Sequence, residues 1–253
     1  MKVPDIIHFI WLTGPNSRPF SYINYLAVKA AALVHKPSKL LMHCNVAPED
    51  NPHWDNASKF FTLVPCNAPE EIRGVPIKYV QYQSDVLRME ILIQHGGIYI
   101  DSDMILLRPL HDLMDSSLTL AEESPSSIAN GVILAAPESE FLKIWQDKIP
   151  EAMKSPTWAY HAVVLPVQLF HEYPHLVTIR DSSYFFPLDL KRNYLCETDP
   201  LQVTGSLSRI GAAHGVHVYE TFWRGYLDDI NPAYMNGASL FAKLFRNLEQ
   251  DGD

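Results

Sequence analysis

The sequence predicts an α/β protein in which short buried strands alternate with amphipathic helices. Ile6–Trp11 is a near-continuous apolar run rich in β-branched and aromatic residues, which is typical of a buried strand. Residues 84–95 have the strongest helical pattern, with Ser84 as a possible N-cap and Gly96-Gly97 as the end. The apolar segment 98–100 follows directly, so a tight turn is expected to join this helix to a buried strand.

The remaining elements continue this alternation along the chain. Helices are expected at 22–34, 141–153 and 240–248, and strands at 39–44, 60–64, 131–135 and 212–219. The apolar segment 160–170 has no clear period, and 184–187 reads as an aromatic loop or an edge strand. No repeat or linker divides the sequence, so residues 1–253 are expected to form a single domain.

Composition narrows the class of protein. Apolar residues make up 47% of the 253 residues and charged residues 19%, which is typical of a globular chain with a sizeable core. The net charge of −9, with no Lys/Arg run, argues against a nucleic acid partner. An acidic protein that binds a diphosphate needs a cation to offset its own field, which favours a metal site.

Cysteine usage and hydropathy give the expected location. Three scattered cysteines, Cys44, Cys66 and Cys196, fit a reducing compartment better than a disulfide framework. No apolar run reaches the roughly 18 residues that span a bilayer, and the N-terminus lacks the apolar core of a signal peptide. We therefore expect a cytoplasmic protein whose membrane association is at most peripheral, on the inner face.

The strongest chemical signal is the Asp-x-Asp sequence formed by Asp101, Ser102 and Asp103. It follows the predicted strand 98–100, and the carboxyl ends of strands are where open α/β sheets bind ligands. In a regular strand both carboxylates share one face, where they could bind one hard cation such as Mg²⁺ or Mn²⁺. The alternative is a solvated loop after the strand.

Asp85 and Arg88 are three residues apart on the predicted helix, and hence neighbours on its surface. They could form a simple surface ion pair. In the functional interpretation, Asp85 accepts sugar hydroxyls while Arg88 braces the sugar or its phosphate.

These motifs together resemble a known family. Residues 84–88 and 96–103 are similar to the Asp-x-Asp sugar-binding region of glycosyltransferase family 32, which includes yeast-type mannosyltransferases and bacterial capsule or lipopolysaccharide glycosyltransferases. They also resemble the catalytic domain of the large clostridial glucosylating toxins. The residues that match in order and spacing are Asp85, Arg88, Tyr99, Asp101 and Asp103.

The resemblance implies roles for specific residues. It implies catalytic roles for Asp85, Arg88, Asn130, Asp101 and Asp103. It implies cofactor binding by Trp11, Tyr99, Asp101 and Trp223, with Trp11 stacking on the nucleotide base. It implies a metal site of Asp101, Asp103 and His217, with His214 as the reserve for His217. A core aromatic is the alternative for Trp11, and a structural histidine for His217.

The resemblance also implies a fold and an activity. The fold would be GT-A, a Rossmann-like mixed sheet flanked by helices, with a nucleotide-sugar-binding half at 1–110 and a sugar and acceptor half at 111–253. The activity would be metal-dependent, retaining hexosyl transfer from a nucleotide-sugar, with UDP-sugars favoured over GDP-sugars by analogy with Trp11. The acceptor would be a glycan, a glycolipid or another lipid-linked sugar, or a protein, in polysaccharide biosynthesis.

The retaining mechanism stays open between an enzyme nucleophile and front-face attack. Glu122 and Glu123 are candidate carboxylates for a nucleophile, although a solvated pair is the simpler interpretation.

Two other functions fit parts of the sequence. A haloacid-dehalogenase-type phosphatase also uses Asp-x-Asp with Mg²⁺, and Asp228-Asp229 could be its late acidic pair. A nucleotide-sugar or carbohydrate binder without turnover is favoured by residues 160–163, where His161 stands in a region expected to carry Gly-Pro.

Overall fold

The computed structural model describes residues 2–14, 17–190, 192–223 and 225–250. Its strands are β1 (Ile6–Trp11), β2 (Lys39–Cys44), β3 (Thr62–Pro65), β4 (Glu71–Ile72), β5 (Val75–Pro76), β6 (Gly97–Ile100), β7 (Met104–Leu106), β8 (Leu118–Ser124), β9 (Ser127–Ala135), β10 (Thr178–Arg180) and β11 (Gly215–His217). Its α-helices are α1 (Tyr22–Ala30), α2 (Pro52–Ala57), α3 (Val80–His95), α4 (Glu140–Ala152), α5 (Tyr160–Val163), α6 (Leu165–Glu172), α7 (Pro200–Ile210) and α8 (Leu240–Gln250). Shorter helical turns are η1 (Ala31–His35, π), η2 (His111–Leu113), η3 (Pro174–Leu176) and η4 (Pro232–Asn236).

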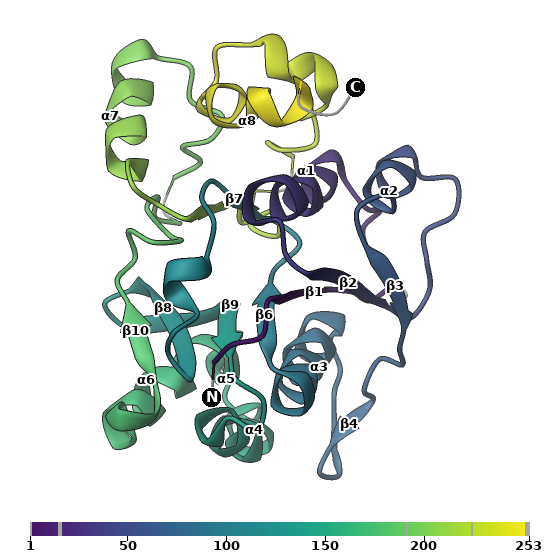
Figure 1. Cartoon of the computed structure of the whole chain (residues 1–253), viewed down its shortest axis with the longest axis vertical. Helices are drawn as coiled ribbons and strands as arrows, with labels where there is room; N and C mark the ends of the chain where they lie inside the picture. Colours follow the sequence, from purple (N-terminus) through teal and green to yellow (C-terminus); the bar gives the residue numbers. More distant parts are fainter. Residues whose placement is uncertain (1, 15–16, 191, 224, 251–253) are drawn as a thin grey trace.

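A mixed seven-stranded sheet forms the centre of the molecule, in the order β10-β8-β9-β6-β1-β2-β3. β1 is parallel to both of its neighbours, β2 and β6, whereas β9 is antiparallel to both β6 and β8. Figure 1 shows α1 and α8 on one side of this sheet and α3 and α4 on the other. The predicted α/β class, a mixed sheet flanked by helices in a single domain, is therefore confirmed.

Strand alternation divides the core into two clusters, one on each face of the sheet. Along β1, Ile7 and Phe9 pack into the cluster that contains α1 and α8, whereas Ile10 packs into the cluster that contains α3 and α4. Side chains of a strand point alternately to opposite faces, so this buried strand contributes to both cores.

Several predicted boundaries shift. The strands at 6–11 and 39–44 match, and the ambiguous segment 160–170 forms the two helices α5 and α6. Ser84 is not the N-cap of its helix. α3 begins earlier, at Val80 after Tyr79, because the buried ring of Tyr82 extends the apolar face of the helix towards the N-terminus.

Figure 1 also shows α7 and α8 beyond the face that α1 covers. Among the described residues, no helix has both the length and the apolar character needed to cross a lipid bilayer.

The Gly96-Gly97 turn allows a buried histidine pair to form beneath α3. Both glycines have positive φ, and a Cβ at Gly97 would lie 2.8 Å from Nε2 of His8. His8 Nε2 donates to the Gly96 carbonyl (3.0 Å), so its Nδ1 accepts from Nε2 of His43 (3.0 Å). This arrangement requires His8 to be neutral, because a protonated Nδ1 could not accept from His43.

Burial and the electrostatic effect of the neighbouring His43 lower the pKa of His8 to about 4. Burial and the electrostatic effect of His95 lower the pKa of His43 to about 4. In the unfolded chain a histidine titrates near about 6.5, so unfolding takes up protons between these values. The stabilisation is complete above about pH 6.5 and is lost as the pH falls towards 4. We expect the free energy of unfolding, measured by urea denaturation, to fall over this range.

His43→Gln should flatten this pH dependence, because each histidine contributes a slope of up to about 1.4 kcal/mol per pH unit. The control His175→Gln removes an exposed histidine and should leave the slope unchanged. Equal slopes for all three proteins would contradict the assignment.

Candidate active site

The main cavity, of about 290 Å³, lies at the carboxyl ends of β1 and β6. The chain runs from β1 to β2 on one side and returns through β6 on the other, so this is the point where the strand order reverses. Ligands of open α/β sheets bind at such points. Trp11 at the end of β1 and Asp101 directly after β6 therefore both line the cavity.

Asp101, Ser102 and Asp103 occupy a turn between β6 and β7, not a regular strand. The expectation that the two carboxylates share a strand face was therefore wrong. They converge for another reason: the Asp101 N–H donates to Gly131 O on β9 (2.8 Å), and the Asp103 carbonyl accepts from Val218 N–H (3.0 Å). Antiparallel pairing of β11 with β7 sets His217 opposite Met104, next to the turn.

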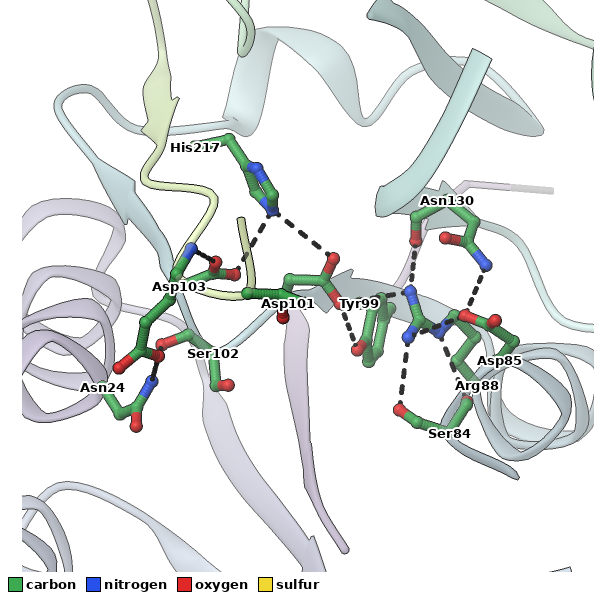
Figure 2. A network of polar contacts seen from close by, with 12 residues as sticks. Asn24, Ser84, Asp85, Arg88, Tyr99, Asp101, Ser102, Asp103, Asn130 and His217 are labelled. Atoms are coloured by element: carbon green, nitrogen blue, oxygen red, sulfur yellow. Dashed lines mark hydrogen bonds and ion pairs between the residues drawn. The ribbon is translucent and has the colours of Figure 1, made fainter. Parts of the chain in front are cut away.

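Each carboxylate has one oxygen held by the protein and one directed at His217 (Figure 2). Asp101 Oδ1 accepts from the Tyr99 hydroxyl (2.6 Å) and pairs with Arg88 (3.1 Å), while Oδ2 lies 3.7 Å from His217 Nε2. Asp103 Oδ2 accepts from Glu220 N–H (2.8 Å), while Oδ1 lies 3.3 Å from the same nitrogen.

A positive charge beside Asp101 and Asp103 keeps these buried carboxylates ionised. Burial alone would lower the pKa of His217, but the Asp103 and Asp101 carboxylates raise it to about 10. Burial likewise opposes ionisation of Asp101, yet the charges of Arg88 and His217 lower its pKa to about 2. Both carboxylates are thus held ionised beside a protonated imidazole, which supplies the positive charge at this position. A metal bound by His217 would displace that proton, because imidazole binds metals in its neutral form.

The donor set fits a divalent metal. One ligand atom from each of Asp101, Asp103 and His217 lies within 4.8 Å of the other two. Oxygen and imidazole ligands suit Mg²⁺ or Mn²⁺. A Cβ at Gly131 would lie 2.7 Å from Asp101 Oδ2 and 3.8 Å from His217 Nε2, so the glycine keeps this space open.

A second acidic and histidine cluster, Asp5 with His35 and His111, has similar spacing but different chemistry. His35 Nδ1 accepts from the Leu110 N–H (3.1 Å), which places the proton of the neutral ring on Nε2. That N–H faces Asp5 at 3.1 Å, so His35 has no lone pair to offer a metal there.

Arg88 joins the helix to the Asp-x-Asp turn. Its guanidinium lies 3.1 Å from both Asp85 and Asp101, donates to Asn130 O (2.8 Å), and stacks over the Tyr99 ring at 4.2 Å. Its side chain is only 5% exposed, and these partners engage its terminal nitrogens. Arg88 thus positions the two carboxylates, whereas its contact with substrate stays a prediction.

Asp85 is held from three directions at the cavity wall. Asn130 Nδ2 donates to Oδ1 (2.9 Å), Arg88 approaches the same oxygen, and His161 Nε2 lies 2.9 Å from Oδ2. The predicted residues Asp85 and Asn130 therefore lie together, and His161 is an added partner.

Sequence reasoning flagged the segment around His161 only as a departure from the family pattern. The structure places the His161 ring against Tyr82 (4.3 Å between centroids), and Trp145 Nε1 donates to its carbonyl (2.8 Å). The imidazole therefore has a fixed orientation towards Asp85. His161 thereby gives this segment a polar contact to the site.

Two further contacts were also missed. Asn24 Nδ2 of α1 donates to the Ser102 carbonyl (3.0 Å) and to Glu220 Oε2 (3.1 Å), so it anchors the Asp-x-Asp turn from the opposite side of the sheet (Figure 2). A lone Asn in a helix carries no sequence signal of this kind. The capping box with Ser21, in which Asn24 also takes part, is its only local pattern.

Other predicted residues lie further from this centre. His214 bonds to the Pro109 carbonyl (2.8 Å) and stacks on Tyr184, so the geometry favours His217 as the third ligand. Trp223 lines a smaller adjoining cavity with His217, and its cofactor contact stays a prediction. Four further candidates from the sequence also lie outside the lining of the main cavity: Glu122, Glu123, Asp228 and Asp229.

Comparison with known proteins shows which families and folds this chain is similar to. Residues 34–120 match the family described as "Glycosyltransferase sugar-binding region containing DXD motif". The fold resembles glycosyltransferase GlyE of Streptococcus pneumoniae (TM-score 0.54, 12% identity, 98% of this chain and 61% of that one). It also resembles the bifunctional glycosyltransferase WbbM (TM-score 0.53, 10% identity, 98% and 50%). The overall fold is therefore similar to that of these two glycosyltransferases, and residues 34–120 match the sequence of a sugar-binding region with an Asp-x-Asp motif.

One relative is similar to this chain in sequence over most of its length. The chain is 28% identical over 252 residues to "Glucan organizing enzyme 1" of Cryptococcus neoformans var. grubii, covering 92% of this chain. It spans 66% of the length of that relative. Both likenesses agree with the resemblance of this chain to glycosyltransferase family 32.

The His161 contact yields a stability prediction. His161→Leu leaves a buried oxygen of Asp85 without a donor, and losing a hydrogen bond to a charged group costs about 1.5–3 kcal/mol. His161→Gln keeps a donor near the Nε2 position and should retain most of the stability. The free energies of unfolding of both variants test this. Equal losses for Leu and Gln would show that the ring contributes by packing alone.

Proposed function

We propose that this chain is a metal-dependent, retaining glycosyltransferase that moves a hexose from a nucleotide-sugar to a glycan, a lipid-linked sugar or a protein. UDP-sugars are favoured over GDP-sugars, and Mn²⁺ or Mg²⁺ is the metal. The observation that carries the proposal is the pair of half-satisfied carboxylates, Asp101 and Asp103, whose remaining oxygens face His217.

The charge of the cavity supports the need for a metal. Asp85, Asp101, Asp103 and Glu220 line it, and its positive groups are Arg18, Arg88 and His217 among the described residues. Arg88 is already paired with two of the acids. When bound, the metal would neutralise the charge of the diphosphate and of the leaving nucleoside diphosphate.

Different residues would bind different parts of the nucleotide-sugar. Asp85 and Asn130 would hold sugar hydroxyls, because both line the cavity and are fixed by the bonds described above. Trp11 would stack on the base, and Tyr99 would hold Asp101 in place through its hydroxyl. The division into halves at 1–110 and 111–253 is part of this proposal.

Transfer breaks the bond between the anomeric carbon and the diphosphate oxygen and forms one to the acceptor hydroxyl, whose proton passes to the leaving phosphate or to solvent. Retention by an enzyme nucleophile would require a free carboxylate. Glu122 and Glu123 lie outside the cavity lining, and both oxygens of Asp85 are engaged. This supports front-face attack.

The name of the fungal relative points to glucan as one acceptor class, within polysaccharide biosynthesis. We place the reaction in the cytoplasm, with at most peripheral membrane contact. The second candidate function is nucleotide-sugar binding without turnover, which slow donor hydrolysis with metal would distinguish from transfer.

Thermal shift with a panel of UDP- and GDP-sugars, each with Mn²⁺ and with EDTA, tests the proposal. We expect one nucleotide class to stabilise the protein, and only with metal, because ligands that bind the native state raise its stability. Asp103→Asn should abolish this shift, since it removes one anionic ligand while its amide oxygen can still accept from Glu220 N–H.

Asp228→Asn is the matched control, because Asp228 is exposed and lies outside the cavity lining. It should keep the shift. Normal donor binding by Asp103→Asn with Mn²⁺, or an equal shift in EDTA, would overturn the metal assignment.

Gly131 gives a separate test of the space between the ligands. Gly131→Ala places a methyl group 2.7 Å from Asp101 Oδ2, so the carboxylate must move. We expect Mn²⁺-dependent donor affinity to fall at least about tenfold, or by about 1.4 kcal/mol.

Gly205→Ala is the control for Gly131→Ala. A Cβ at Gly205 would meet nothing within 4 Å, and the residue lies within helix α7, where alanine is favoured over glycine by about 0.5–1 kcal/mol. This variant should bind donor normally and be slightly more stable. Equal affinities of the two variants would show that the space at Gly131 is not used.

A further inference from the structure

Three aromatic rings form a cluster at one side of the cavity mouth. Tyr79 and Trp158 are 49% and 46% exposed, although both are large apolar side chains. Tyr82, which is buried, lies between them and the interior. Ring centroids are 5.2 Å apart for Tyr79 and Tyr82, 5.3 Å for Tyr79 and Trp158, and 5.1 Å for Tyr82 and Trp158. Exposed apolar groups that gather in this way mark binding surfaces.

The cluster is held in a fixed geometry. The Tyr82 hydroxyl accepts from Ala159 N–H (3.0 Å), which ties the residue after Trp158 to helix α3. Ala159 has a left-handed backbone (φ 54°, ψ 22°), a conformation that a residue with a Cβ adopts at a cost. The backbone is therefore strained at Ala159, directly after the exposed Trp158.

This cluster is continuous with the donor-sugar end of the site. The Tyr82 ring packs edge-on against His161 at 4.3 Å, and His161 bonds to Asp85 at 2.9 Å. Tyr82 and Asp85 are i, i+3 neighbours on α3. Trp158 and Tyr82 line the same cavity as Asp85 and Asp101. A ligand on the rings would therefore lie beside a sugar held by Asp85.

The chemistry of the surroundings favours a saccharide over an aliphatic chain. Flat aromatic faces suit the C–H face of a sugar ring, and Tyr and Trp add polar edges. Gln81 and Ser84 line the cavity between the rings and Asp85, where they can bond to hydroxyl groups. A lipid chain would offer Gln81 and Ser84 no hydrogen bond, although Ser84 Oγ would keep the one that it accepts from Arg88.

We propose that Trp158, with Tyr79 and Tyr82, forms the subsite that binds the saccharide acceptor and stacks its sugar ring next to the donor sugar at Asp85. This rests on the transferase activity proposed above. It commits the acceptor to the glycan class, and the terminal sugar ring is the recognised part.

The test follows the NMR signal of the Trp158 indole N–H. The chain has five tryptophans, and the signal of Trp158 is assigned as the one that is missing from the spectrum of Trp158→Phe. The probes are methyl β-D-glucopyranoside, methyl β-D-galactopyranoside and methyl α-D-mannopyranoside, added with and without UDP and Mg²⁺, and hexanol as an aliphatic probe. We expect at least one glycoside, and not hexanol, to shift the Trp158 signal.

In the same samples, Trp158→Ala should weaken glycoside binding about tenfold, which is a modest loss for one stacked ring. Trp158→Phe, which keeps a ring, should lose less, and Tyr79→Ala should also weaken binding. Leu201→Ala is the control, because Leu201 is 83% exposed on α7, outside the cavity lining. It should bind glycosides as the unaltered chain does.

If no glycoside shifts the Trp158 signal, or only hexanol does, the saccharide subsite is overturned. UDP binding separates the two proposals. UDP and Mg²⁺ binding without any glycoside effect at Trp158 refutes the subsite alone. Glycoside binding at Trp158 in a protein that binds no nucleotide refutes the donor assignment and leaves the saccharide site standing.

Discussion

The guanidinium of Arg88 lies between two carboxylates that belong to different parts of the chain. Asp85 comes from α3 and Asp101 follows β6, and Arg88 is 3.1 Å from both. Burying a cation costs free energy unless it is paired and hydrogen-bonded. Neighbouring buried carboxylates likewise need a cation beside them to offset their charge. The contact therefore fixes the distance between the part of the cavity that would hold the sugar and the part that would hold the metal.

In each acid of the Asp-x-Asp turn, other groups of the protein hold one carboxylate oxygen and leave the second one directed at His217. Arg88 and Tyr99 occupy one oxygen of Asp101, and the Glu220 N–H occupies one of Asp103. The two remaining oxygens therefore face the same point, beside His217. Preorganisation of this kind removes the freedom that loose carboxylates would lose on binding a cation. It requires partners from the helix, the sheet and the late segment at once, so the site exists only in the complete fold.

The limits of sequence reasoning follow from this arrangement. The Asp-x-Asp turn, the Gly-Gly helix end and the first strand were predictable, because each is a local pattern with a local cause. His161 and Asn24 were not identified, because their contacts to Asp85 and Ser102 span 76 and 78 positions in the sequence, and a single polar residue carries no period. The start of α3 was misplaced for a related reason: Tyr82 is buried only because distant residues, His161 among them, pack on it.

The first half of helix α3 lies along the cavity, from its mouth to the buried ion pairs. Tyr79, Tyr82, Asp85 and Arg88 follow one another at three-residue intervals, so each touches or neighbours the next. The inner two are bound into the buried ion network, where a change would expose unpaired charge. Tyr79 meets solvent, whereas Tyr82 is buried against Trp158 and His161. A substitution of Tyr79 can therefore alter the surface at the mouth while Arg88 continues to hold Asp85 and Asp101. In the proposed function this would separate acceptor choice from donor chemistry along a single helix.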